Sequence, residues 1–259
     1  MQNITVSEKL GILTISLNRP HFRNALSAEM IEDLTKAFIG TVASSQLRGV
    51  HLRGEGKAFC AGADLGSMQE MVKYSLEKNH QEALVLHDMF AAIYECPVPV
   101  VVEAHGAAFG GALGLIATGD IVIAEAQTQF CFSEVKLGLV PALISDFISR
   151  KVALGPVSAW MLSGQVFGTS EALTCGLVHQ SANSTELGAS VEKTLQNLRD
   201  SGPEALRETK KLLRSIPSLK APELRERTAR VISARRVSAE GQEGLKAFLE
   251  KRRCAWRLS

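Results

Sequence analysis

Two glycine-rich turns and one glutamate are the residues of this chain whose types and spacing could do chemistry. Gly110 and Gly111 follow an apolar strand and open a helix, and residues 61–64 form a similar small-residue turn earlier in the chain. The first residues of a helix have free backbone N–H groups and lie at the positive end of the helix dipole. Two such turns that converge could hold a carbonyl oxygen that gains negative charge.

Glu134 is the acid that could act beside these turns. A single glutamate is most often a solvated surface charge, but the neighbours of Glu134 are apolar: Phe130, Cys131, Phe132, Val135 and Leu137. Burial raises the pKa of a carboxyl toward the range that is useful for proton transfer near neutral pH. Anion-stabilising amides together with one carboxylate predict chemistry through an enolate. The competing interpretation is that the glycines only allow close packing.

Other catalytic patterns are missing from the sequence. Neither turn has the spacing of a phosphate-binding loop or of a dinucleotide-binding fingerprint. The six histidines form no H-x-x-x-H or H-E-x-x-H pair, and no serine lies in a nucleophile elbow. We therefore expect no metal site and no hydrolase triad. His105 is interpreted as a packing residue, and Glu103 as a surface charge at the end of a strand.

The composition indicates a globular enzyme-sized protein without a strong electrostatic bias. The chain has 259 residues, 46% hydrophobic and 22% charged, with a formal net charge of +2. One large domain, or a domain with an appendage, fits this length. The small net charge does not favour nucleic acid as a partner. No signal peptide or membrane span is predicted, and five scattered cysteines indicate reduced thiols and a cytoplasmic location.

Alternating strands and helices must position these turns. Strands are predicted at residues 11–17, 49–54, 97–102 and 120–124, with one more at the start of segment 56–64. Helices are predicted after Ser27, over 67–95 and from Pro141 to about residue 153. This alternation favours an α/β architecture with helices on both faces of the sheet. From residue 185 onward only helices are predicted, such as those at 203–213 and 221–237. They form an appendage that packs on the core or on another subunit.

Taken together, these segments resemble the crotonase superfamily of enoyl-CoA hydratases and isomerases. The motifs occur in the family's order at residues 18–20, 24–26, 57–65, 105–111, 129–139 and 247–253. The resemblance implies the crotonase fold, a spiral of repeated ββα units, over residues 1–195. It also implies a helical region for trimerisation over residues 196–259. The chain looks most like bacterial methylglutaconyl-CoA hydratases of leucine degradation.

The resemblance also implies roles for individual residues. The N–H groups of Ala63 and Gly111 match the positions that hold the thioester oxygen in the family, and Glu134 matches the second of two catalytic glutamates. The first glutamate falls on Gly114, which cannot hold water or transfer a proton. Relatives with only the second acid include enoyl-CoA isomerases, although the methylglutaconyl type also carries glycine here. Asp146 could partly replace the missing acid, but a solvent-facing aspartate is the simpler interpretation.

The same resemblance predicts the partners of this chain. Coenzyme A enters as part of the substrate, with no other cofactor, and the binding residues implied for it are Arg23, Lys57, Ala61, Ala63, Asp64, Leu65, Phe248 and Lys251. Phe248 and Lys251 would come from the neighbouring subunit of a homotrimer or a dimer of trimers, although a solvated helix end explains the basic tail equally well. A short branched or carboxylated 2-enoyl-CoA is the expected substrate.

Three other functions stay open at this stage. Isomerisation of an enoyl-CoA and decarboxylation of a carboxyacyl-CoA pass through the same enolate as hydration. A relative of the methylglutaconyl type also binds AU-rich RNA, which makes RNA binding a hypothesis of a different class. The sequence offers no lysine-rich helix, and its two Tyr and two Trp are few for base stacking. No nucleic acid and no membrane are therefore expected as partners.

Overall fold

The computed structural model describes residues 2–40 and 47–257, and a six-stranded sheet forms its centre. The strands, in sheet order, are β1 (Ile4–Lys9), β2 (Ile12–Leu17), β3 (Gly49–Gly54), β4 (Val100–Ala104), β6 (Ile121–Glu125) and β9 (Gln180–Ala182). All neighbours pair in parallel except β1 and β2. The three valines of β4 are fully buried, as expected for a parallel strand covered on both faces.

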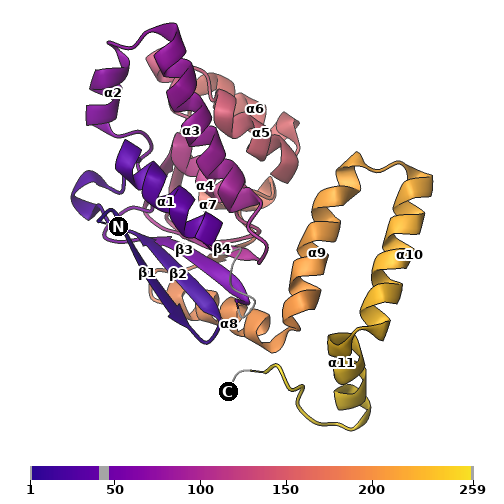
Figure 1. Ribbon diagram of the computed structural model, residues 1–259. Coiled ribbons are helices and arrows are strands. Elements are labelled where there is room, and N and C mark those ends of the chain that lie inside the picture. Colours follow the sequence, from indigo (N-terminus) through magenta and orange to yellow (C-terminus); the bar gives the residue numbers. More distant parts are fainter. Residues whose placement is uncertain (1, 41–46, 258–259) are drawn as a thin grey trace.

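Helices cover both faces of this sheet (Figure 1). On one face lies the main core, to which α1 (Ala28–Gly40), α3 (Leu76–Tyr94) and α4 (Gly111–Thr118) contribute buried apolar side chains. On the other face lies α8 (Leu187–Asp200), whose Val191 and Leu195 pack with Val101 and Ile123. Both faces of the central strands β3, β4 and β6 are therefore largely closed to water, which leaves the strand ends for catalytic groups.

A second sheet and several short helices extend from the ends of these strands. The three-stranded sheet has the order β5 (Ala107–Phe109), β7 (Gln129–Cys131) and β8 (Phe167–Gly168). The remaining elements of the core are η1 (Pro20–Phe22), α2 (Leu65–Met71), η3 (Glu134–Leu137), α5 (Ala142–Lys151), α6 (Leu154–Ser163) and α7 (Thr169–Thr174). Because β5 runs directly into α4 and β7 into η3, this sheet brings the two segments with catalytic potential together.

The last helices project from the core (Figure 1). They are α9 (Pro203–Ser215), η4 (Ile216–Ser218), α10 (Ala221–Val237) and α11 (Ala239–Leu249). Lys210 of α9 connects them to the core, because its Nζ donates to the Val98 carbonyl at 2.8 Å and to Asp120 Oδ2 at 2.6 Å. Residue 195, the predicted end of the core, lies inside α8, and the projecting helices begin only after Ser201. No helix of the described residues is long and apolar enough to cross a bilayer.

The α/β alternation predicted from the sequence is confirmed, and three local predictions are wrong. The helix expected over 67–95 is two helices, because Ser75 caps α3 and accepts a hydrogen bond from Lys78 N–H at 3.2 Å. Segment 56–64 holds two isolated bridges, at Cys60 and Ala63, instead of a strand. Glu103 is not a surface charge, because its Oε2 lies 2.8 Å from His51 Nε2 and its side chain is 12% exposed. The strands β1 and β9 were not expected.

Candidate active site

The two glycine-rich turns are hydrogen-bonded to each other. Cys60 N–H donates to the Ala107 carbonyl at 3.1 Å, and Phe109 N–H donates to the Cys60 carbonyl at 3.2 Å. Gly62 has a φ of +92°, and a Cβ there would lie 2.7 Å from the Phe109 carbonyl oxygen. Only glycine fits this close approach without strain. The convergence of the turns that the sequence predicts is therefore confirmed.

Each turn presents one free backbone N–H. Leu26 bridges to Ala63 by donating to the Gly62 carbonyl at 2.8 Å and accepting from Asp64 N–H at 3.2 Å. In a parallel bridge of this kind, the N–H of Ala63 itself points away from Leu26. Gly111 is the first residue of α4, where an N–H has no partner within the helix. Among the described residues nothing accepts from either N–H, so both can bind an oxyanion.

Glu134 lies beside these amides at the start of η3. A Cβ built on Gly110 would lie 3.5 Å from Glu134 Oε1 and 3.3 Å from Ser133 Oγ. The other carboxylate oxygen, Oε2, is buried and has no hydrogen-bond partner in the described part of the chain. Burial is the main cause that raises the pKa of Glu134 above its ordinary value. The site therefore contains a desolvated carboxylate next to the N-terminus of α4.

Gly114, where the resemblance implies a missing acid, is tightly packed. A Cβ there would lie 2.6 Å from the Phe90 ring and 2.7 Å from Ile144 Cγ2. Gly114, Phe90 and Ile144 are all buried. The space that a second carboxylate would need is therefore filled by an aromatic ring from α3 and a branched side chain from α5. No sequence motif indicates this packing, because the three residues are far apart in the chain.

Asp146 is held at the surface of α5. Its two carboxylate oxygens each accept a hydrogen bond from Arg150 at 2.9 Å, and Oδ2 lies 3.7 Å from His87 Nε2. The Asp146 side chain is 40% exposed. The Asp146 carboxylate, which could have replaced the acid missing at Gly114, is therefore paired with Arg150.

The residues expected to bind coenzyme A fall into two groups. Arg23, Ala61 and Asp64 lie near one another, because Ala61 N–H donates to the Arg23 carbonyl at 3.0 Å and the next turn leads to Asp64. Lys57 is exposed on a loop, and Leu65 is exposed as the first residue of α2. Phe248 and Lys251, in contrast, belong to the projecting C-terminal region, away from this group within one chain (Figure 1).

Arg19 and Asn24 position this region and were not singled out from the sequence as site residues. The Arg19 guanidinium lies 3.0 Å from Asp64 Oδ2 and donates to the Ala25 carbonyl at 2.7 Å. Asn24 is fully buried, and its side-chain amide donates to the Ala58 carbonyl at 2.9 Å. Both residues occur in the motifs at 18–20 and 24–26, so the motifs were the available signal.

Comparisons with known proteins agree with this geometry. The family model described as enoyl-CoA hydratase/isomerase matches residues 7–258. Enoyl-CoA hydratase ACTT6 of Alternaria alternata is 36% identical over 201 residues, which cover 77% of this chain and 65% of the fungal protein.

Solved structures share the whole fold. An enoyl-CoA hydratase from Shewanella pealeana superposes with a TM-score of 0.93 at 33% identity, covering 98% of this chain and 96% of that one. Pseudomonas aeruginosa AtuE gives a TM-score of 0.95 at 32% identity, covering 99% of this chain and 100% of that one. The crotonase fold predicted from the sequence is thereby confirmed. With its paired amides and buried glutamate, this chain is an enzyme that belongs to the enoyl-CoA hydratase/isomerase family.

Proposed function

We propose that this chain hydrates a short, branched or carboxylated 2-enoyl-CoA of the 3-methylglutaconyl-CoA type. The observation that carries the proposal is the buried Glu134 carboxylate, whose Oε2 has no partner among the described residues and which lies beside Gly110. A carboxylate with one free oxygen can hold and deprotonate a water molecule. Coenzyme A is part of the substrate, and the reaction needs no other cofactor.

The proposed reaction uses Glu134 as the single acid and base. The N–H groups of Ala63 and Gly111 donate to the thioester oxygen, which stabilises negative charge on it. Glu134 takes a proton from water while the water oxygen bonds to C3, and the electrons of the C2=C3 bond move onto the thioester as an enolate. Glu134 then gives the proton to C2, so that one water has been added and the carboxylate is restored.

A substrate series tests this proposal. Purified protein is incubated with 3-methylglutaconyl-CoA, crotonyl-CoA and a 3-enoyl-CoA, and the products are separated by mass and retention. We expect both 2-enoyl substrates to gain one water, with the branched, carboxylated one preferred. Conversion of the 3-enoyl substrate alone would refute the hydratase proposal.

Isomerisation of a 3-enoyl-CoA is the second candidate, and the packing at Gly114 favours it. With Phe90 and Ile144 in the place of a second acid, Glu134 could remove a proton from C2 and return it to C4 while the amides hold the enolate. No water is consumed in that reaction. Decarboxylation of a carboxyacyl-CoA would use the same enolate, and the release of carbon dioxide would distinguish it.

Changing Asp146 to Asn is expected to leave the turnover number within about threefold of wild type. The Asp146 carboxylate is bound by Arg150, and exposed ion pairs of this kind contribute on the order of 1 kcal/mol or less. Steady-state kinetics with crotonyl-CoA measure the effect. A hundredfold loss would instead assign Asp146 the role of the substitute acid.

We further propose that the active protein is cytoplasmic and is a homotrimer or a dimer of trimers, in which Phe248 and Lys251 reach the coenzyme A of a neighbour. Phe248 and Leu249 support this assembly, because these large apolar side chains are 81% and 77% exposed on α11. Changing Phe248 to Ala should raise KM for the acyl-CoA several-fold with kcat nearly unchanged. An unchanged KM, or a monomer in sedimentation velocity of the wild type, would contradict the proposal.

A further inference from the structure

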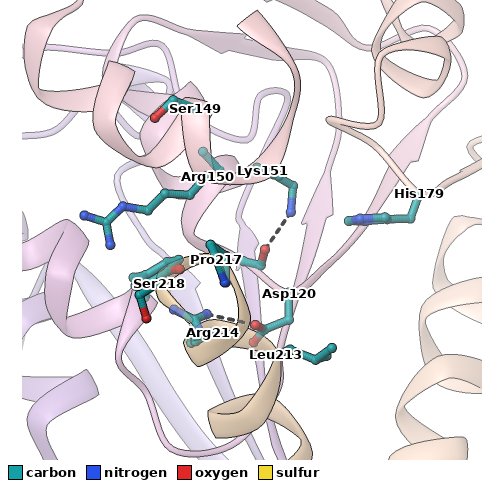
Figure 2. Close-up of a pocket in the computed structure, with 12 residues that line it drawn as sticks. Asp120, Ser149, Arg150, Lys151, His179, Leu213, Arg214, Pro217 and Ser218 are labelled. Carbon is teal, nitrogen blue, oxygen red and sulfur yellow. Dashed lines mark hydrogen bonds and ion pairs between the residues drawn. The ribbon is translucent and has the colours of Figure 1, made fainter. Parts of the chain in front are cut away.

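A pocket of about 640 Å³, whose lining does not include Glu134, lies at the C-terminal end of α5 (Figure 2). Both α4 and α5 begin beside the candidate active site, at Gly111 and Ala142, and both end at this pocket. These helices are about 12 and 15 Å long, at 1.5 Å per residue. Its walls come from α3, α5, α9 and the start of β6, so the pocket is separate from the place assigned to the acyl-CoA.

Lys151 supplies the first positive charge of this pocket. It is the last residue of α5, and its Nζ donates to the Gly119 carbonyl at 2.7 Å (Figure 2). An ammonium group has three hydrogens to donate, and this bond uses one. The Lys151 side chain lines the pocket, so its remaining donors are available to a ligand.

Arg214 supplies the second charge. Its Nη2 donates to Asp120 Oδ1 at 2.9 Å, and its guanidinium lies 3.4 Å from the centroid of the Tyr94 ring. These contacts hold the group in one orientation. Its Nη1 is buried and, among the described residues, has no hydrogen-bond partner. Arg214 lines the pocket, so its guanidinium adds a positive charge to this wall.

His179 supplies a donor from a third segment. Its Nδ1 accepts a hydrogen bond from Val122 N–H at 2.9 Å. In the neutral ring the proton must therefore lie on Nε2. Figure 2 shows the His179 ring directed into the pocket, opposite Lys151.

Among the described residues, no free carboxylate neutralises these groups. Asp120 is the one acid of that part of the chain that lines the pocket, and it already accepts from Val100 N–H, Lys210 and Arg214 at 2.6 to 2.9 Å. Arg150, at another wall, is paired with Asp146 outside the lining. Three cations, Lys151, Lys210 and Arg214, therefore surround one carboxylate. The other walls carry two hydroxyls, of Ser149 and Ser218, and four apolar groups: Ala117, Leu213, Pro217 and the ring of Tyr94.

We propose that this pocket binds a phosphate-type oxyanion, held by the Lys151 ammonium, the Arg214 guanidinium and His179 Nε2. Charge-assisted hydrogen bonds to such donors are short and strong. The ligand connects α5 and the strand end of the core to α9, the first of the projecting helices. The proposal does not depend on the assignments made for the active site.

Sulfate is the first probe, titrated by calorimetry at pH 7 against protein in chloride of equal ionic strength. We expect one site per chain with a dissociation constant of about 1 mM or below. Changing Lys151 to Gln should weaken binding at least roughly tenfold. The matched control changes exposed Lys193 of α8 to Gln, which removes the same charge and should leave binding unchanged. Equal binding by the Lys151 variant, or no binding by wild type, overturns the proposal.

A second measurement uses only the wild-type protein, so it tests the contact with Lys151 even if the Lys151 variant does not fold. Burial, and repulsion by Arg214, lower the pKa of Lys151 to about 8 against the attraction of Asp120. The other groups that face it are His179 and Lys210, each with a pKa lowered by burial. Because a bound anion favours the charged ammonium, sulfate binding should take up a proton near pH 8. Sulfate itself does not titrate there, so binding without proton uptake contradicts the assigned contact.

Two further arms identify the source of the anion. Phenyl phosphate binding more tightly than inorganic phosphate supports an organic phosphate ester as the ligand, and equal binding supports the inorganic ion. A carboxylate from a second copy of this chain is the competing occupant. In that case no anion would bind to the assembled protein, and changing Lys151 to Gln would lower its mass in sedimentation velocity. That result would overturn the proposal.

Discussion

Changing Glu134 to Gln is expected to lower the turnover number by about a hundred- to ten-thousandfold, the usual size of a general acid–base contribution. The amide has nearly the same shape as the carboxylate but cannot accept the proton of water. The coenzyme A site and the two amides are unchanged by the substitution, so we expect acyl-CoA affinity to stay within a few-fold. Steady-state kinetics and titration of the acyl-CoA measure the two effects separately.

The pH profile provides an independent check of the same residue. Because burial raises the pKa of Glu134 above its ordinary value of 4.5, activity should fall as the pH drops through this raised pKa. The exposed acid Glu186, changed to Gln, serves as the matched control and should keep both rate and pH profile. Retained activity of the Glu134 variant would remove the central assignment.

The same carboxylate should reduce stability at neutral pH. A carboxyl whose pKa is raised by folding holds its proton more tightly in the folded state than in the unfolded one. Ionisation of Glu134 therefore costs stability, fully so above the folded pKa, and the cost disappears below the unfolded value of 4.5. At pH 7 the Gln variant is accordingly expected to melt no lower than wild type.

Changing Gly114 to Glu is expected to destabilise the fold instead of restoring a second catalytic acid. The new Cβ would meet Phe90 and Ile144 at 2.6 and 2.7 Å, and overpacking of a core costs about 1–3 kcal/mol. The charged group would then be surrounded by apolar side chains, which adds several kcal/mol unless it is protonated. We expect the free energy of unfolding in urea to fall by about 3 kcal/mol or more.

Two variants separate the steric from the electrostatic part of this loss. Gly114→Ala introduces only the Cβ. Its free energy of unfolding should fall by less than that of Gly114→Glu, because alanine gains about 1 kcal/mol over glycine in helix propensity. In the double variant Gly114→Glu/Phe90→Ala, removal of the Phe90 ring makes space for the new side chain. The loss of stability that remains in this variant includes the cost of burying the charge. A stable Gly114→Glu variant with faster hydration would show that the packing around Gly114 yields easily and that a second acid can work there.

The sequence predicted those parts of the fold that depend on local pattern. The strand at 49–54 and the helix at 221–237 occur with the predicted bounds, because an alternation of apolar and polar residues between two glycines and a Pro-initiated helix are local signals. The break at Ser75 was missed, since the apolar residues on both sides keep a helical spacing. Glu103 was misjudged because its partner, His51, lies on the neighbouring strand.

In the candidate site, too, features that depend on local sequence were predicted and contacts between distant segments were not. The convergence of the two turns and the position of Glu134 beside Gly110 were expected from motifs that are continuous in the sequence. The packing of Phe90 and Ile144 on Gly114 was not, because helix α3 meets α4 and α5 only in three dimensions. Lys151, His179 and Arg214 likewise come from three distant segments and form no sequence motif.

The hydrogen bonds that join Cys60 to Ala107 and Phe109 have a consequence for how such enzymes diverge. They are made by backbone atoms alone, so the distance between the Ala63 and Gly111 amides does not depend on which side chains line the acyl group. Mutations at positions such as 90, 114 and 144 can therefore reshape the space beside Glu134, or remove an acid, while the proposed oxyanion site persists. A descendant that loses one reaction in this way keeps the means to acquire another.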